Sequence, residues 1–325
     1  MTTAMVTKEL AVASFSKVYD LEQVETALNE LGDSANEALR ATYEKMLKVG
    51  NLRFCVKPNR MPSIDALLDA LPNFAEPLED VRRQVALCME TEDRLEVMPI
   101  LLLGEPGIGK THFAKALSRL FGTAYQYVAM SSLTAGWILS GASSQWKNAK
   151  PGKIFETLVN GSYANPVIVV DEIDKANGDS QYDPLGALYA LLEHETAQAF
   201  IDEFAEIPIN AAQVIWIATA NDDRAIPEPI LSRMSVYEIM PPDVAGARRI
   251  AQVIYDEIRS AHSWGQRFPA ALGDDALDAL AHASPRDMRR AILHGFGAAR
   301  VDGRDEVRAD DIRLDRATRR RQIGF

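Results

Sequence analysis

The chain has 325 residues, of which 47% are hydrophobic and 25% are charged, and its formal net charge is −11. This length predicts two or three structural units, with enough apolar residues for a sizeable core. The acidic balance argues against a protein that coats nucleic acid through its overall field, so a nucleic-acid partner is not expected.

The sequence predicts a cytoplasmic protein. The start, MTTAMVTKELAVAS, has no basic segment followed by a long apolar run, which a secretory signal would need. No stretch approaches the roughly 18 apolar residues that span a bilayer, so no membrane partner is expected. Cys55 and Cys88 lie outside any CxxC pattern and fit two small buried thiols in a reducing compartment.

Residues 1–73 are predicted to form a helical N-terminal region. Apolar residues recur there every three or four positions, first at Val18, Leu21, Val24, Leu28 and Leu31, and then at Leu39, Tyr43, Met46 and Leu47. Gly50 and Asn51 are expected to end the second helix. Two more helices are expected at 63–71 and 77–91.

Five short apolar runs separated by helical stretches follow, within residues 74–242. They are Ile100–Leu103, Tyr125–Met130, Val167–Val170, Val214–Thr219 and Val236–Met240. Continuous apolar strands that alternate with helices indicate a parallel sheet covered on both faces, so this segment is expected to be an α/β domain. In such sheets the chemistry gathers at the carboxyl ends of the strands.

Residues 243–325 are expected to form a separate, purely helical domain. Asp243 and Asp274 are candidate N-caps, and Ser284 followed by Pro285 is a strong signal for a helix start. Gly303 is expected to follow the end of that helix.

The first predicted strand leads into a phosphate-binding loop. The pattern GxxxxGK[ST] is fitted by Gly104, Glu105, Pro106, Gly107, Ile108, Gly109, Lys110 and Thr111, and a helical sequence follows from His112. Glycines let the backbone fold around phosphate with its N–H groups inward, and the helix N-terminus favours negative charge. Lys110 is expected to reach the β and γ phosphates of ATP, and the Thr111 hydroxyl to bind Mg²⁺. His112 borders the nucleotide as a helix residue rather than as a catalyst.

Two other predicted strands end in polar residues. Asp171 and Glu172 follow the run at 167–170, where Asp171 suits the Mg²⁺ shell and Glu172 suits deprotonating the attacking water. Asn221 ends another run, and its amide suits hydrogen bonds to the γ-phosphate and the water. Taken alone, the two acids could be a solvated loop and Asn221 a turn residue. The phosphate-binding loop favours the functional interpretation.

These elements, in this order, resemble AAA+ ATPases and, in detail, the ATPase module of Lon proteases. The similar segments are Pro151–Ile154, Asn165–Lys175, Asp183–Pro184 with the following GALYALLE, and Ile226–Met234. The resemblance covers about residues 74–300 and implies a five-stranded P-loop module with a helical lid, using ATP and Mg²⁺. Because the chain stops at Phe325, we expect it to lack the Ser–Lys peptidase domain of Lon.

The resemblance implies three further roles. Arg233, in a Leu-Ser-Arg-Met turn, matches the arginine finger that reaches the γ-phosphate held by a neighbouring subunit, which implies a ring, usually a hexamer. Arg286 matches the second sensor arginine of the lid. Trp146 matches the aromatic residue of the pore loop that grips an unfolded chain, although tyrosine is usual there. Alternatively, Arg233 could form a surface ion pair and Trp146 could pack locally.

Three function hypotheses follow. The first is an ATP-driven protein remodeller that forms a ring and acts on a protein client. The second is a nucleotide switch or assembly scaffold, in which ATP binding sets ring formation and hydrolysis is slow. The third, a DNA-directed motor, is disfavoured by the acidic net charge.

Overall fold

The computed structural model describes residues 12–32, 36–130, 137–176 and 183–314. The chain divides into two compact units. Unit 1 comprises residues 1–62, 80–103 and 114–237, and unit 2 comprises residues 63–79, 104–113 and 238–325. The domain limits expected after residues 73 and 242 stay a prediction.

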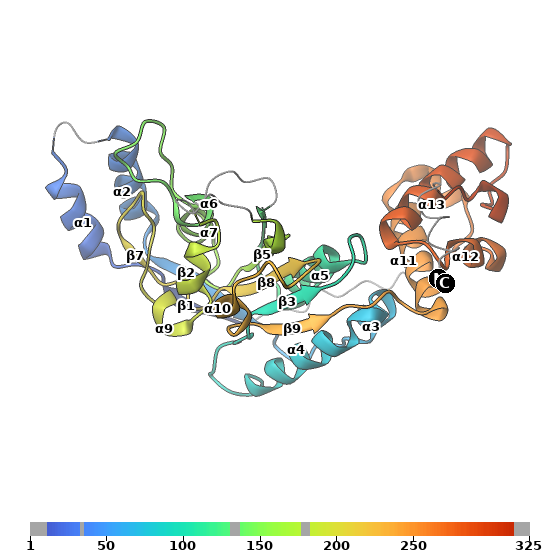
Figure 1. Ribbon diagram of the computed structural model, residues 1–325, viewed down its shortest axis with the longest axis horizontal. Helices are drawn as coiled ribbons and strands as arrows, with labels where there is room; N and C mark the ends of the chain where they lie inside the picture. Colours follow the sequence, from blue (N-terminus) through green and yellow to red (C-terminus); the bar gives the residue numbers. More distant parts are fainter. Residues whose placement is uncertain (1–11, 33–35, 131–136, 177–182, 315–325) are drawn as a thin grey trace. The chain divides into compact units, whose positions relative to one another are not determined.

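Unit 1 is built around a five-stranded sheet with the strand order β4-β5-β8-β3-β9 (Figure 1). The strands are β3 (Ile100–Leu103), β4 (Tyr125–Ala129), β5 (Val167–Asp171), β8 (Ile215–Ala220) and β9 (Ser235–Glu238). β4 with β5, β5 with β8, and β8 with β3 pair in parallel, so their carboxyl ends lie at one edge. The predicted α/β class and its five strands are confirmed.

Two inner strands of the sheet, β5 and β8, are apolar because both of their faces are buried. All six residues of β8 and the first four of β5 are buried. One apolar cluster joins Ile168 of β5 and Trp216 of β8 to Phe155 of α7 (Lys153–Asn160) and Leu188 of α8 (Gly186–Leu191). Burying continuous apolar runs on both faces fixes the sheet, and with it the direction in which each strand delivers its last residue.

The other elements of unit 1 are short or lie near the N-terminus. They are β1 (Val12–Lys17), α1 (Leu21–Glu30), α2 (Glu37–Val49), β2 (Leu52–Lys57), α6 (Trp137–Ser140), the 3-10 helix η3 (Ile173–Lys175), α9 (His194–Ala197), β6 (Phe200–Ile201), β7 (Pro208–Ile209) and α10 (Glu228–Leu231). Two helices run from one unit into the other, α4 (Ala75–Leu87) and α5 (Lys110–Phe121).

The prediction of a purely helical start needs a correction. Helices α1 and α2 are present, and α2 ends at Gly50 as expected, but β1 and β2 form an antiparallel pair. Their burial pattern is inverted, because Phe15 is exposed whereas Arg53 is 5% exposed. The Arg53 guanidinium is buried because it donates to the Leu158 and Val159 carbonyls at the end of α7. Polar residues therefore point inward, and the alternation that normally marks a strand is hidden.

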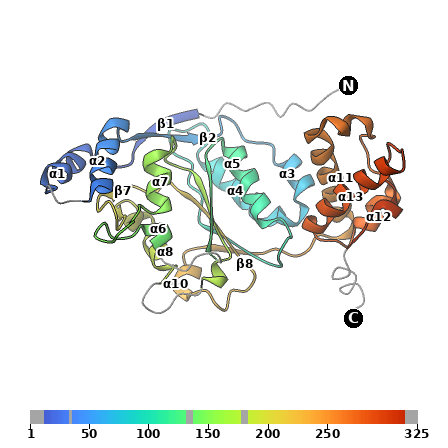
Figure 2. The ribbon, with the colours of Figure 1, turned by 90° about the horizontal axis from the view of Figure 1, so that it is seen from above.

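Unit 2 contains a helical bundle formed by α11 (Val244–Ala261), α12 (Asp274–Leu280) and α13 (Pro285–Val301), which lie together in Figure 2. Tyr255 and Phe296 stack in its core with their ring centroids 4.9 Å apart. The unit also holds α3 (Asp65–Ala70) and the short helices η1 (Pro72–Phe74), η4 (Ser263–Arg267) and η5 (Ala309–Asp311).

The helix ends of unit 2 follow local capping chemistry. The Asp243 side chain accepts from Gly246 N, and the Ser284 hydroxyl accepts from Asp287 N, as predicted. Gly303 follows α13 at a φ of 72°, again as expected. Asp274 begins α12 itself, with Gly273 in the N-cap position, so that prediction was wrong by one residue. Within the described residues, no helix is both long and apolar enough to cross a membrane.

Candidate active site

The phosphate-binding loop begins directly after β3 and ends at the first residue of α5. Gly104, Gly107 and Gly109 have φ angles of 154°, 84° and 110°, a region that side chains disfavour. A Cβ atom on Gly104 would lie 2.5 Å from the Ile239 carbonyl oxygen. The glycines therefore meet a backbone requirement, and they turn the chain sharply into the N-terminus of a twelve-residue helix.

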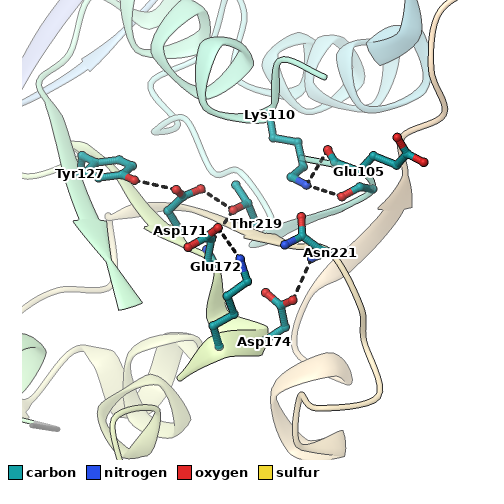
Figure 3. Close-up of polar contacts among 10 residues, drawn as sticks. Glu105, Lys110, Tyr127, Asp171, Glu172, Asp174, Thr219 and Asn221 are labelled. Carbon is teal, nitrogen blue, oxygen red and sulfur yellow. Dashed lines mark hydrogen bonds and ion pairs between the residues drawn. The ribbon is translucent and has the colours of Figure 1, made fainter. Parts of the chain in front are cut away.

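Lys110 is buried within this loop, and its ammonium donates to the carbonyl oxygens of Gly104 and Glu105 (Figure 3). Thr111 and His112 are exposed in the first turn of α5. Of the remaining loop residues, Glu105 and Pro106 are exposed and Ile108 is buried. A positive charge, an exposed hydroxyl and a helix N-terminus thus come together in one short segment, which suits a phosphate chain.

Within unit 2 the loop lies beside the first turn of α13. A Cβ atom on Gly107 would be 3.6 Å from Ser284 Oγ and 3.5 Å from Arg286 Cβ. Ser284 caps the helix, and this cap fixes the position of Arg286 two residues later. The predicted loop and the predicted sensor arginine are therefore neighbours in space, although Gly107 and Arg286 are 179 positions apart in sequence.

Asp171 ends β5 and accepts hydrogen bonds from hydroxyl groups on the two neighbouring strands (Figure 3). Tyr127 Oη on β4 donates to Asp171 Oδ2 at 2.6 Å, and Thr219 Oγ1 on β8 donates to Asp171 Oδ1. Burial and the adjacent carboxylate raise the pKa of Tyr127, which keeps this phenol a donor. The Asp171 carboxylate is thus held in one orientation by two donors that its strand does not supply.

Glu172 follows with a left-handed backbone, at a φ of 57° and a ψ of 49°. Its N–H donates to Thr219 Oγ1 at 3.1 Å, so one threonine hydroxyl orients both acids. Its carboxylate accepts from Lys175 Nζ at 2.6 Å, and this hydrogen bond raises the pKa of Lys175. A non-glycine residue in this region is strained, and such strain is typical of functional sites.

Asn221 follows β8 at the same edge of the sheet. Its N–H donates to Asp174 Oδ2 at 3.2 Å, which ties the residue to the short helix that follows Glu172. Hydrogen bonds therefore cross from the end of β5 to the end of β8 through Thr219, and from η3 to the residue after β8 through Asp174 and Asn221.

The two side chains predicted to bind Mg²⁺ have suitable chemistry for that ion. The Asp171 carboxylate in unit 1 and the Thr111 hydroxyl in unit 2 are each the kind of hard oxygen ligand that this ion prefers, and their joint site stays a prediction. Within the described residues, no group of three or more metal-binding side chains exists.

Arg233 lies just after α10 and is paired inside its own chain. Its guanidinium contacts Glu193 Oε2 at 2.8 Å and donates to the Pro229 carbonyl at 2.6 Å. The surface ion pair considered from the sequence is therefore present. The finger role stays a prediction, and it requires Arg233 to leave Glu193.

Trp146 is 46% exposed and packs edge-to-face against Trp137, with ring centroids 5.5 Å apart. Both the exposure expected of a gripping residue and the local packing expected of a structural one are present. The pore-loop role stays a prediction.

Sequence reasoning missed four residues that contact the predicted ones, namely Tyr127, Thr219, Lys175 and Glu193. Thr219 carried a signal, because a hydroxyl near the end of an otherwise apolar strand is unusual when buried. Lys175 lies three residues after Glu172, which is within reach of a local ion pair. Tyr127 and Glu193 lie about 40 residues from their partners and gave no local signal.

A parallel sheet with a glycine-rich loop after one strand and two acids after another defines a P-loop nucleotide-binding domain. Residues 100–242 match the family described as "ATPase family associated with various cellular activities (AAA)". This part of the chain is an AAA domain.

The most similar curated relatives include Lon proteases. Lon protease 2 of Sorangium cellulosum is 37% identical over 142 residues, which are 43% of this chain and 18% of that protein. The Lon protease of Frankia alni is 31% identical over 203 residues, which are 59% of this chain and 23% of that protein. The matches thus span less than a quarter of either relative, and the resemblance to the ATPase region of Lon is confirmed.

A solved structure supports the fold alone. A closed-state cryo-electron microscopy reconstruction of Hsp104 with ATPyS and FITC casein matches with a TM-score of 0.58 and 16% identity, over 85% of this chain and 50% of that one.

Proposed function

We propose that this chain is a ring-forming AAA+ ATPase that uses ATP hydrolysis to remodel proteins. The observation that carries the proposal is the Asp171–Glu172 pair, fixed by hydroxyl groups at the carboxyl end of β5, in a sheet whose β3 leads directly into the glycine loop. A solvated acidic loop would not need donors from both neighbouring strands.

Lys110, the loop N–H groups and Arg286 would hold the ATP phosphates, and Thr111 with Asp171 would hold Mg²⁺. An ion held there would supply positive charge to offset that of the phosphates. The closeness of Gly107 and Arg286 supports a role for the lid in sensing the nucleotide. A cation in the first turn of a helix opposes the helix dipole, and a phosphate ligand compensates for that cost.

Glu172 would accept the proton of the attacking water, and Asn221 would orient that water through its amide. The hydrogen bond to Lys175 must then loosen, because a carboxylate held by an ammonium is a weaker base. Arg233 would leave Glu193 and place its charge on the γ-phosphate bound by the next subunit. That step requires self-association, and Trp146 would contact a protein client.

Replacing Glu172 with Gln tests the assignment. Loss of the base should lower ATP turnover by about two to four orders of magnitude while ATP still binds, because the amide keeps the size of the side chain. Turnover and equilibrium binding of ATP are measured on the same preparation. Glu25→Gln, on the exposed side of α1, is the matched control and should behave as wild type. Wild-type turnover in Glu172→Gln would overturn the assignment.

A nucleotide switch or scaffold is the second candidate, and the Arg233–Glu193 ion pair favours it. If that pair persists in the assembled protein, Arg233 does not reach the γ-phosphate bound by the neighbouring subunit. ATP is then bound but hydrolysed slowly. The same experiment separates the two, because the wild-type protein would then turn over ATP scarcely faster than Glu172→Gln.

A further inference from the structure

A second candidate site lies in unit 1, and its lining includes none of the residues proposed to bind or hydrolyse ATP. It is a groove of about 860 Å³ that we call the tryptophan groove. Its walls come from α6, from the loop carrying Trp146, and from residues 183–203, which include α8 and β6. The residues that define it are Trp137, Trp146, Asp183, Glu195, Ile201 and Glu203.

The aromatic wall is supported by backbone hydrogen bonds and by a contact between its two rings. Trp137 and Trp146 are 40% and 46% exposed and contact each other at an interplanar angle of 83°. Between them, Gly141 N donates to the Trp137 carbonyl at 2.6 Å, and Ala142 N donates to the Lys150 carbonyl at 3.1 Å. Two large apolar surfaces are therefore presented to solvent by a loop that is hydrogen-bonded to itself.

The polar wall is negatively charged. Asp183, Glu195 and Glu203 line the groove, and no Lys, Arg or His is among its described lining residues. Glu203 accepts from the Ser140 hydroxyl at 3.1 Å, and Asp183 accepts from Leu185 N at 2.9 Å. In the part of the chain that is described, none of the three carboxylates forms an ion pair with a basic side chain. Lys147 and Lys150 follow Trp146 on the loop but lie outside the groove lining.

We propose that the tryptophan groove binds Lys or Arg side chains of an extended polypeptide. An indole face attracts a cation, the carboxylates complement its charge, and the apolar stem of a long basic side chain suits the space between them. The same charges repel an acidic segment or a nucleic-acid backbone. The inference rests on the proposed function, because it names the class of polypeptide that a remodeller of this kind would hold.

The test measures binding of fluorescently labelled, unstructured Gly/Ser peptides that differ only in carrying four Arg or four Glu residues. Fluorescence anisotropy with the full chain reports binding without requiring turnover. The Arg peptide should bind about tenfold or more tightly than the Glu peptide, with a preference that weakens as salt is raised.

The triple variant Asp183→Asn, Glu195→Gln, Glu203→Gln should reduce that preference severalfold. Each replacement keeps a carbonyl oxygen that can accept the bonds from Leu185 N and Ser140, so the loop keeps its support. The control variant Glu25→Gln, Glu30→Gln, Glu44→Gln removes the same charge from exposed positions on α1 and α2 and should retain the preference.

Equal affinity for the Arg and Glu peptides would overturn the proposal. So would a preference for the Arg peptide that falls equally in the triple variant and in its control. Because the readout is peptide affinity, its failure would leave the ATPase assignment standing. Conversely, an inactive ATPase with retained Arg-peptide preference would reject the proposed function and keep the groove.

Discussion

Asp171 owes its orientation to hydroxyl groups from the strands on either side of β5. Tyr127 comes from β4 and Thr219 from β8, and each donates to a different carboxylate oxygen. Thr219 also accepts from Glu172 N, so it links the proposed metal ligand to the proposed base. Residues that hold a metal ligand in this way fix its geometry, and their mutation typically lowers metal affinity or activity by about 10- to 100-fold.

Removing these hydroxyls should raise the Mg²⁺ concentration needed for half-maximal ATP hydrolysis. Thr219→Val should have the larger effect, because Thr219 is 1% exposed and its hydroxyl also accepts the hydrogen bond from Glu172 N. Losing that acceptor should lower the free energy of unfolding by about 1–3 kcal/mol. Tyr127→Phe, at a 42% exposed position, should change the Mg²⁺ requirement with little loss of stability. Mg²⁺ titrations of turnover and denaturant unfolding measure both, and titrations that overlay wild type in both variants would contradict this role.

At the residue scale, the sequence predicted those site residues that are adjacent to one another in the chain. The glycine loop and the acids after β5 are contiguous in sequence, and a strand or helix beside them fixes their setting. The partners of Arg233 and Asp171 were not predictable, because Glu193 and Tyr127 reach them only through tertiary packing. Whether Arg233 pairs with Glu193 or extends toward a neighbouring subunit depends on such tertiary contacts and not on the Leu-Ser-Arg-Met motif.

At the scale of elements, Asp202 joins two segments that flank the tryptophan groove. Its side chain is fully buried and accepts from Gly152 N, at the start of α7, at 2.7 Å. It also accepts from Phe204 N and Ala205 N at 3.0 and 3.2 Å. Burial raises the pKa of Asp202 to about 6, against 3.8 for an ordinary aspartate.

This raised pKa predicts a pH-dependent contribution to stability. The folded protein binds a proton at Asp202 more tightly than the unfolded chain, so the contribution is full below about pH 4 and is lost as the pH rises through 6. The unfolding free energy of wild type minus that of Asp202→Asn should therefore fall by about 2–3 kcal/mol between pH 4 and 7. Denaturant unfolding of both proteins across this range measures it. A difference that does not change with pH would contradict the buried, hydrogen-bonded carboxylate.

The strands of the central sheet were predictable because burial on both faces makes each one a continuous apolar run. The β1–β2 pair was not, because Phe15 and Phe54 point outward and stack at 5.1 Å while Arg53 points inward. That arrangement depends on the carbonyls at the end of α7, about 100 residues away in sequence. Local periodicity cannot report a partner at such a distance.

At the scale of the whole molecule, the proposed function depends on one subunit completing the active site of another. Lys110 would act on nucleotide bound by its own subunit, whereas Arg233 would act on nucleotide bound by its neighbour. The sequence suggested this division only through resemblance. Mixing two defective proteins distinguishes an active site shared between subunits from one completed within a single chain.

The most direct test is therefore the steady-state ATP hydrolysis of Lys110→Ala, of Arg233→Ala and of their equimolar mixture. Each variant alone should be nearly inactive, since one cannot hold ATP and the other lacks the finger. The mixture should regain turnover, because an intact nucleotide site of the Arg233→Ala protein can meet the intact Arg233 of the Lys110→Ala protein. A mixture as inactive as its components, with both variants folded and associating, would contradict a shared active site. Full turnover by Arg233→Ala alone would contradict it as well.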